Sequence, residues 1–596
     1  MIEPRIYRAA FIPALLAIVL VAFSLEAPPQ PLGQGLAADA LFDGQEASGL
    51  LSEILQTAND RRPGHAGDRA VASEVQTAFT RAGFPTTVDR FTAGGHQLVN
   101  VVARKPGDVT RQIVIVAGRD AAGVPDAASS GADTAALMEF AHVLQGSATH
   151  DTIVLASLDG QTLGDAGARE LAPSIPRAGP VDAVISISNL GADRSRGPLI
   201  VAWSNSSRRG SVGLERTAAE SLRDELGQVP HAEGALAQFA RLAFPIAPGA
   251  QGALLKAGLP AIRISGSGEL PPAHQRFSDI DQARYGELGR GALRLVSTLD
   301  GNARTPTPGP PSYVQISGQL LPGWGVSVLA LTLMLPALLA STDAFARTRR
   351  RHDAVAPWLG WLAIGAAPFA LAYIAGKLFV LVGLGPYAPP SPLLPGLASL
   401  GVAGSCLLAL TVCVAALAWI LLRPWLIRLA GGLPRPNAPG AACATALVIS
   451  VLGFALAFVN PYAAVVLVPF VHLALLALLT EMRWSRAALA IAAGLLPLAA
   501  IVLYYSVRFE LDPLHGACYL VLLVLGGQPG VLGTVAICVL LGACASLAAI
   551  LLERFRERPE RPERAAAPEA PPRPVFGPGG HAGPGALGGT RSTLRR

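Results

Sequence analysis

The chain has 596 residues, of which 51% are hydrophobic and 15% are charged, and its mean hydropathy is +0.44. This composition is too apolar for an ordinary water-soluble protein and predicts several membrane spans. The net charge of +6 does not indicate a nucleic-acid partner, because most of the arginine excess stands beside apolar segments, where it orients a membrane protein. Abundant Ala, Arg, Gly and Pro with almost no Lys are typical of a GC-rich bacterial genome.

The N-terminal segment, residues 1–25, carries Arg5 and Arg8 before an apolar run. We interpret it as a signal anchor or transmembrane helix, with a cleaved signal peptide as the alternative. Either reading exports residues 26–317. The apolar run from 320 to 341 ends in "RTRRRH", which places that end in the cytoplasm and agrees with export of the preceding segment.

The exported segment contains no cysteine, which excludes a disulfide framework and a thiolate zinc site there. Helical periodicity over 47–84 ends at Gly83, as a helix C-cap does. Strands then alternate with helices, so we expect an α/β domain with a mostly parallel central sheet flanked by helices. Ligands of such sheets bind at the carboxyl ends of the strands. The expected strands are "TTVDRF", "QLVNVVARKPG", "RQIVIVAGRD", "DTIVLASLDG" and "DAVISIS".

Residues 318–552 consist mostly of apolar runs of membrane length, and we expect a bundle of about seven transmembrane helices. The motif "GGQPG" breaks the last run, which predicts a re-entrant or interfacial half-helix before one full span at 530–552. With the N-terminal helix, eight spans are expected. Residues 553–596 have no apolar periodicity and are interpreted as a disordered cytoplasmic tail. The other expected spans are 320–341, 356–384, 395–422, 440–459, 461–480 and 487–506.

Three ionisable residues lie in or near these spans, and such groups are candidates for function because they are costly in a bilayer. We expect Lys377 to snorkel, His472 to stay neutral, and Arg508 to lie at the outer interface with Glu510 and Asp512. A transporter or permease subunit is one alternative function, and it predicts a polar cavity in the bundle that contains Lys377 or His472.

The order and spacing of seven motifs in about residues 47–300 resemble the family-28 metallopeptidases, the di-zinc aminopeptidases. The motifs are "RRPGHAGDRAVASEVQTAFTRAGF", "LVNVVARKPG", "IVIVAGRD", "SSGADTAALMEFAHVL", "IVLASLDGQTLGDAG", "AVISISNLG" and "GLPAIRISGSGELPPAHQRFSD". The resemblance implies an aminopeptidase fold with a zinc site at the strand ends.

Transferred by this resemblance, the zinc site is degenerate. Its first histidine corresponds to Gly118, and its bridging aspartate falls at about Ser129, with Asp126 and Asp133 close enough for a gap to move the match. The paired glutamates, general base and ligand, correspond to Gln161 and Thr162. Ser188 and His274 correspond to the two remaining ligands, and only His274 matches a zinc ligand. Asp120 is the retained orienting aspartate and completes the vestigial site.

These replacements predict loss of catalysis. Two zinc ions about 3.5–4 Å apart need a bridging carboxylate and several N or O ligands. Glycine supplies no ligand, and the Gln161 amide cannot accept a proton from water. We therefore expect no metal or other cofactor, or zinc if the protein is instead a divergent membrane-bound aminopeptidase or hydrolase.

Other readings of these residues stay open. Asp120 fits a loop or helix cap as well as a vestigial role. His274 fits a hydrogen-bonded loop histidine, and the Gly-rich stretch 263–272 fits either a cleft lining or an ordinary loop. A relocated carboxylate site is a further alternative, built from Asp126, Asp133, Asp159 and Asp165.

The combination of an N-terminal span, an exported peptidase-like domain and a helical bundle is similar to two relatives of that family. One is the endoplasmic-reticulum metallopeptidase, and the other is the GPI-anchor attachment subunit of GPI transamidase, which has lost its zinc ligands. We therefore hypothesise a multi-pass plasma-membrane pseudoenzyme in contact with the bilayer. Its exported domain would bind a peptide, a lipoprotein, a lipid-linked substrate, or a membrane or exported protein partner.

Overall fold

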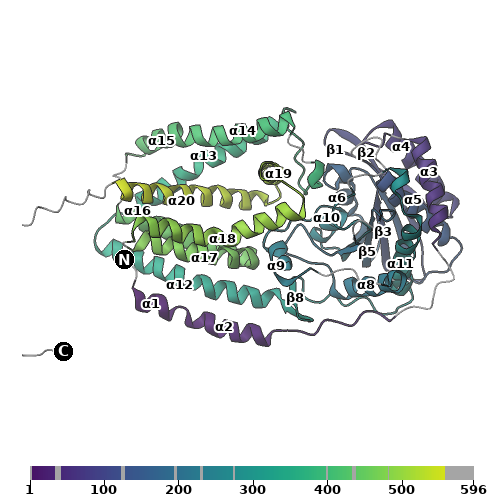
Figure 1. Ribbon diagram of the computed structural model, residues 1–596, viewed down its shortest axis with the longest axis horizontal. Coiled ribbons are helices and arrows are strands. Elements are labelled where there is room, and N and C mark those ends of the chain that lie inside the picture. The colour runs from purple at the N-terminus through teal and green to yellow at the C-terminus, as the bar shows by residue number, and fades with distance from the viewer. Residues whose placement is uncertain are drawn as a thin grey trace, which may run out of the picture.

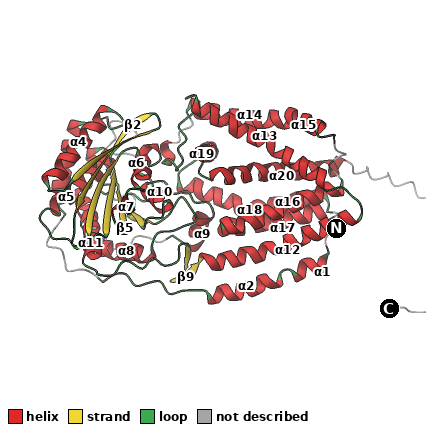
Figure 2. Ribbon diagram, turned by 180° about the vertical axis from the view of Figure 1, so that it is seen from behind, coloured by secondary structure: helices red, strands yellow, loops and turns green. Residues whose placement is uncertain are grey.

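The chain forms an α/β part, which contains a seven-stranded sheet, and a helical part, and the two lie side by side (Figure 1). Figure 2 shows the strands of the sheet in the first part and long helices in the second. The computed structural model describes residues 3–33, 42–58, 60–121, 128–193, 197–227, 233–272, 276–397, 401–432, 436, 438–480 and 482–556.

The main sheet has the strand order β1-β2-β4-β3-β5-β7-β6. Its four central strands, β4, β3, β5 and β7, run parallel, while the β1–β2, β2–β4 and β6–β7 pairs are antiparallel. The α/β fold class is thus confirmed, with a parallel centre and antiparallel edges. The strands are β1 Thr86–Ala93, β2 His96–Lys105, β3 Gln112–Gly118, β4 Thr152–Leu158, β5 Val181–Ser188, β6 Leu199–Val201 and β7 Ala261–Ser265.

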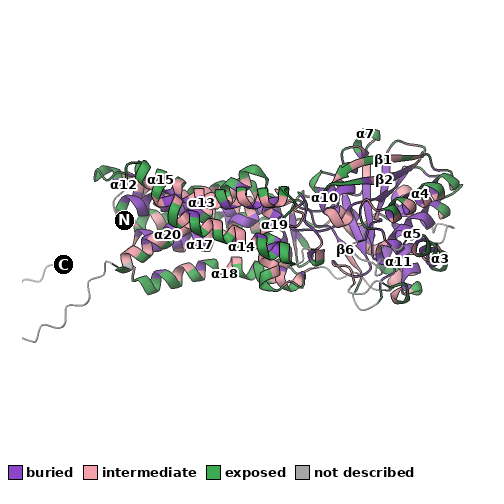
Figure 3. Cartoon of the chain, turned by 90° about the horizontal axis from the view of Figure 1, so that it is seen from above, coloured by how far each residue is buried: buried purple, intermediate pink, exposed green. Residues whose placement is uncertain are grey.

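Helices cover both faces of this sheet, because the parallel strands are apolar on both sides. Each face has its own apolar core, and Figure 3 shows the buried residues concentrated around the strands. One face packs against α3 Gly44–Thr57, α4 Ala66–Arg81, α5 Ala128–Val143, α8 Val212–Leu226 and α11 Gln282–Asp300. The other packs against α6 Ala166–Leu171, α7 Ile175–Ala178 and α10 Ala250–Lys256, and this face is turned toward the helical part (Figure 1).

Within the described residues, eight helical segments are long and apolar enough to cross a membrane, the number expected. They indicate a multi-pass membrane protein. The first comprises α1 Pro4–Ala9 and α2 Ile12–Phe23; the others are α12 Gly323–Arg350, α13 Ala356–Leu381, α14 Val402–Leu417 with its continuation to Leu429, α16 Pro439–Val459, α17 Pro461–Leu479, α18 Trp484–Arg508 and α20 Gly530–Arg556.

Several of these segments differ from expectation at their ends, and α12 continues to Arg350, nine residues beyond the expected end at 341. The fourth starts at Val402 rather than 395, after a proline-rich loop with one 3-10 turn, η3 (Pro395–Leu397), and it continues through a π-helical turn, η4 (Ala418–Leu422), into α15 (Arg423–Leu429). Helix α20 runs to Arg556, four residues into the predicted tail, whose remainder lies outside the described residues. The short helix expected before it is α19, Pro513–Gly526.

The ionisable residues of the spans have structural partners. Lys377 donates to the carbonyl of Leu525 near the end of α19. His472 contacts the Tyr7 hydroxyl through Nδ1 (2.7 Å) and the Leu333 carbonyl through Nε2 (2.9 Å). The histidine thereby joins the N-terminal helix to α12 and α17.

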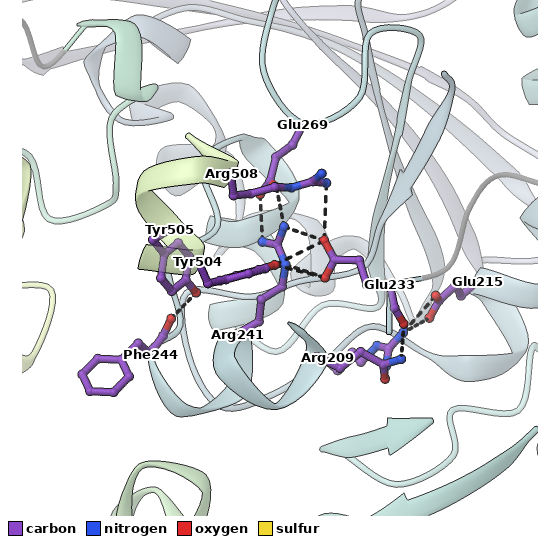
Figure 4. A network of polar contacts seen from close by, with 10 residues as sticks. Arg209, Glu215, Glu233, Arg241, Phe244, Glu269, Tyr504, Tyr505 and Arg508 are labelled. Carbon is purple, nitrogen blue, oxygen red and sulfur yellow. Dashed lines mark hydrogen bonds and ion pairs between the residues drawn. The ribbon is translucent and has the colours of Figure 1, made fainter. Parts of the chain in front are cut away.

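The α/β part is joined to the bundle by a network of charges (Figure 4). Arg508, the last residue of α18, donates from Nε to Oε2 of Glu269 (2.9 Å) and pairs with Glu233 (3.3 Å). Arg241 of α9 (Ala235–Ala243) binds both of these carboxylates. Burial opposes ionisation of Glu269, yet the guanidinium groups around it lower its pKa to about 2.

Arg508, expected at the outer interface with Glu510 and Asp512, thus also links the two parts of the chain. Its carboxylate partners come from segments more than 200 residues earlier in the chain, and only the tertiary fold brings them together. The junction also contains a two-stranded hairpin, β8 Tyr313–Ile316 with β9 Gln319–Pro322.

Candidate functional site

A small pocket opens at the carboxyl ends of the central strands, on the face covered by α6 and α10. Its free space is about that of one water molecule. Three of the predicted site residues, Gly118, Gln161 and Ser188, line it. The lining is completed by Leu158, Asp159, Asp165, Ala168, Ser186, Ile187, Gly249, Ala250 and Arg263.

Gly118 ends β3, and its missing side chain is replaced in space by a neighbour. A Cβ built on Gly118 would overlap the amide oxygen of Gln161, which lies in the 3-10 turn η1 (Gln161–Leu163). The space beside position 118 therefore holds an amide. The wild-type arrangement leaves no room there for an imidazole.

Asp120 is turned away from the pocket and toward the η1 turn. One carboxylate oxygen accepts from the backbone N–H of Gln161 (2.7 Å), and the other from the N–H (2.9 Å) and hydroxyl (2.6 Å) of Thr162. Burial raises the pKa of Asp120, although these hydrogen bonds oppose the shift. The residue is a turn cap, the structural alternative that its sequence context left open.

Arg119, between those two positions, forms a buried ion pair that the sequence did not reveal. Its guanidinium donates two bonds to Asp68 of α4 (2.9 and 2.8 Å) and one to the hydroxyl of Ser157 (3.1 Å). The carboxylate of Asp159 lies 3.7 Å away. Burial, reinforced by nearby carboxylates, raises the pKa of Asp159 to about 8 despite Arg119.

The end of β5 is tied to α5 by side chains that the zinc pattern would require as ligands. Ser129 donates from its hydroxyl to the side-chain oxygen of Asn189, and Asp133 accepts from the backbone N–H groups of Asn189 (2.8 Å) and Leu190 (3.1 Å). Ser188, in contrast, has a buried hydroxyl without a hydrogen-bond partner among the described residues. It is thus available to a small polar ligand in the pocket.

Arg263 and Asp165 supply the charged side of the pocket. Arg263 interrupts the apolar strand β7 and is 2% exposed; its Nη2 donates to the Glu269 carbonyl (3.0 Å), while its Nε has no partner among the described residues. Asp165 accepts from the Gly249 N–H (3.1 Å), and burial raises its pKa to about 7. An arginine within a buried strand was the sequence signal for this group.

The residues at this site do not fit a pair of zinc ions. No group of three or more His, Cys, Asp or Glu side chains suited to a metal occurs in the part of the chain that the structure describes. His274 and Asp126 lie outside the described residues. Asp159 and Asp165 share the pocket, as the relocated carboxylate alternative requires, but Asp133 is used to hold the β5 loop.

A loop of the helical part packs beside the pocket. A Cβ on Gly164, next to η1, would lie 2.6 Å from Cγ of Pro389 in the loop between α13 and α14. In the same loop, the Ser391 hydroxyl accepts from the side-chain amide of Asn205 (3.1 Å). This loop therefore contacts the α/β part next to the η1 turn, although the residues that line the pocket all come from the α/β part.

Comparison with solved structures shows similarity over less than half of this chain. A glutaminyl cyclase from an Acidobacteriales bacterium is 19% identical, with 46% of this chain and 99% of that one covered and a TM-score of 0.36. A zinc aminopeptidase from Bacillus subtilis is 9% identical, with 43% and 95% covered and a TM-score of 0.37. A leucine aminopeptidase precursor from Bacteroides thetaiotaomicron is 14% identical, with 44% and 99% covered and a TM-score of 0.38.

At these identities and TM-scores, the similarity carries no inference about activity. No protein-family model matches the sequence, and no curated protein matches it significantly. Function must therefore be argued from the site itself.

Proposed function

We propose that the α/β part is a binding domain without peptidase activity, exported from a bacterial cell and held at its plasma membrane. Its ligand is a peptide, a lipoprotein, a lipid-linked molecule or a partner subunit. The observation that carries the proposal is the placement of Gln161. Its amide fills the space beside Gly118, where the resemblance to family-28 metallopeptidases would put the first zinc histidine.

The neighbouring groups support the same conclusion. The carboxylate of Asp120 is occupied by backbone and hydroxyl donors of the η1 turn and is not directed at a metal ligand. Ser129 is hydrogen-bonded to Asn189. Three polar atoms of the pocket residues have no hydrogen-bond partner among the described residues: the Ser188 hydroxyl, the Nε of Arg263 and Oδ1 of Asp159. The first two suit a polar or anionic group of a ligand. The proposal also draws on the resemblance of the sequence to the GPI-anchor attachment subunit of GPI transamidase.

Metal analysis of the purified full-length protein tests this proposal. After incubation with zinc and removal of the excess, we expect well under one zinc ion per chain and no effect of a chelator on the melting temperature. Incubation with aminoacyl amide substrates should give no chelator-sensitive hydrolysis. About two tightly bound zinc ions per chain, together with aminopeptidase activity that a chelator abolishes, would overturn it.

One observation favours a second candidate, a hydrolase that uses carboxyl groups without a metal pair. Asp159 and Asp165 line one pocket and have pKa values of about 8 and about 7, a range suited to acid–base chemistry. This candidate predicts chelator-resistant hydrolysis that Asp165→Asn abolishes. The same substitution should leave a pure binding domain folded and equally inactive.

A further inference from the structure

A buried arginine in the helical part lacks a partner for its charge. Arg423 follows the π-helical turn η4 at the start of α15, and only 9% of it is exposed. Its guanidinium carbon lies 4.5 Å from the ring centroid of Trp361 in α13 and 4.3 Å from that of Trp419. The aromatic faces attract the positive charge of the guanidinium. They are not conventional hydrogen-bond acceptors for its five N–H groups.

The hydrogen-bonding capacity of Arg423 is unused. Within the described residues, its side chain makes no hydrogen bond or ion pair, and its Nε and Nη2 are buried. A second unpartnered group lies nearby, the hydroxyl of Ser546 in α20, which is 0% exposed. A Cβ on Gly365 would lie 3.1 Å from this hydroxyl and 3.9 Å from Nε of Arg423, so both groups lie beside Gly365, where α13 packs closely against α20.

Two other buried arginines have carboxylate partners: Arg119 is paired with Asp68, and Arg241 with Glu269. The partly buried Arg554, near the end of α20, donates to two backbone carbonyls. A buried cation with no such partner costs several kcal/mol. Helical π-turns are also frequent at functional sites. The combination indicates a site that is completed by an anion from outside the chain.

The position of the site selects the kind of anion. Arg423 precedes the end of α15 by six residues, about 9 Å along the helix axis, and α15 lies at the end of the bundle away from the sheet (Figure 1). Trp419 and Trp361 lie in two candidate membrane spans whose most apolar stretches are only 11% and 22% buried, respectively. The site therefore adjoins surfaces that face lipid. We propose that Arg423 and Ser546, with the two tryptophans, bind the phosphate of a membrane phospholipid.

The test uses full-length protein purified in dodecyl maltoside, with phosphatidylglycerol or inorganic phosphate as the added probe. Native mass spectrometry counts retained phospholipid, and thermal unfolding measures the stabilisation that each probe gives. Arg423→Gln should reduce phospholipid retention at least tenfold. The matched control is Arg428→Gln, which removes the same charge from an exposed position on the same helix and should retain lipid like the wild type.

Ser546→Ala keeps the test valid if Arg423→Gln does not fold. Because this hydroxyl has no hydrogen-bond partner among the described residues, alanine should leave the melting temperature of lipid-free protein unchanged while reducing the shift produced by phosphatidylglycerol. Equal lipid retention in wild type and Arg423→Gln, or equal loss in Arg428→Gln, would overturn the proposal. Stabilisation by inorganic phosphate alone, with no retained lipid, would overturn the assignment to a phospholipid.

Discussion

The amide of Gln161 occupies the place where a side chain at Gly118 would begin, so these two residues form a sterically matched pair. They lie 43 positions apart and belong to different structural elements, the end of β3 and the η1 turn. A histidine restored at 118 alone would meet this amide before it reached a metal. The two replacements are therefore coupled by packing as well as by the chemistry that they remove.

A double-mutant cycle measures this coupling. Gly118→Ala should lower the free energy of unfolding by roughly 1–3 kcal/mol, because the added methyl group forces the Gln161 side chain to move. The loss should shrink in a Gln161→Ala background, where the space is empty. Gly49→Ala is the control: a Cβ there meets nothing within 4 Å, so alanine in this exposed helical position should be neutral or stabilising. An equal cost of Gly118→Ala in both backgrounds would contradict the pairing.

The pH dependence of stability should reflect two buried acids of the α/β part. Burial raises the pKa of both Asp133 and Asp165 to about 7, from the ordinary value of 3.8. Between these values the folded state holds protons that the unfolded chain has released, so stability falls as pH rises from about 4 to 7. The melting temperature of the full-length protein should be higher at pH 5 than at pH 8.

Asp165→Asn provides the check on that assignment. The amide keeps an acceptor for the Gly249 N–H and tolerates the left-handed backbone at this position (φ 54°). It should stabilise the protein at pH 8 by up to roughly 4 kcal/mol and make the pH profile flatter. An unchanged slope in this variant would show that Asp165 does not titrate as described.

The stability that the charge network at the junction contributes should change with pH in the opposite direction and should be lost as pH falls. Because the pKa of Glu269 is lowered to about 2, its contribution is complete above about pH 4.5 and is lost as pH falls toward 2. Glu269→Gln should cost roughly 3 kcal/mol, since Arg241 and Arg508 keep only Glu233 as a carboxylate partner. Asp512→Asn changes an exposed acid near the end of α18 and should leave the melting temperature almost unchanged. Thermal unfolding of both variants distinguishes the two cases.

The packing of the N-terminal helix against the bundle should depend on the contact between Tyr7 and His472. Tyr7→Phe leaves a buried imidazole nitrogen without its partner and should lower stability by roughly 1–2 kcal/mol. Tyr373→Phe is the matched control, because that hydroxyl makes no hydrogen bond to any described residue. An equal effect of the two substitutions would mean that the Tyr7 contact contributes nothing specific.

The N-terminal segment is expected to remain attached. The intact mass of the membrane-purified protein should therefore include residues 1–25.

Sequence reasoning located the elements well because their signals are local. Apolar runs of membrane length identified the eight long helices, and alternating strand and helix patterns identified the α/β part. The antiparallel edges were not predicted, since the direction of a strand depends on its neighbours. The start at Val402 was missed because the prolines before it interrupt an apolar run without making it polar.

The site was predicted less completely because its chemistry depends on contacts across the chain. The sequence identified Gly118, Gln161 and Ser188, which do line one pocket. It could not show that Asp120 would bind the backbone of η1, or that Arg263 would place an unpartnered Nε in the same pocket. Those properties arise from strand register and from loops that meet only in the folded protein.

The loop between α13 and α14 bears on whether the two parts of the chain are separable. Pro389 and Ser391 of that loop lie against Gly164 and Asn205, beside the pocket, and Arg508 supplies charge to Glu269. Expressing residues 26–317 alone would therefore remove the contacts of this loop and leave Glu269 without the charge of Arg508. The helical part completes the packing and charge pairing of the α/β part, so the two are expected to fold and to be purified as one unit.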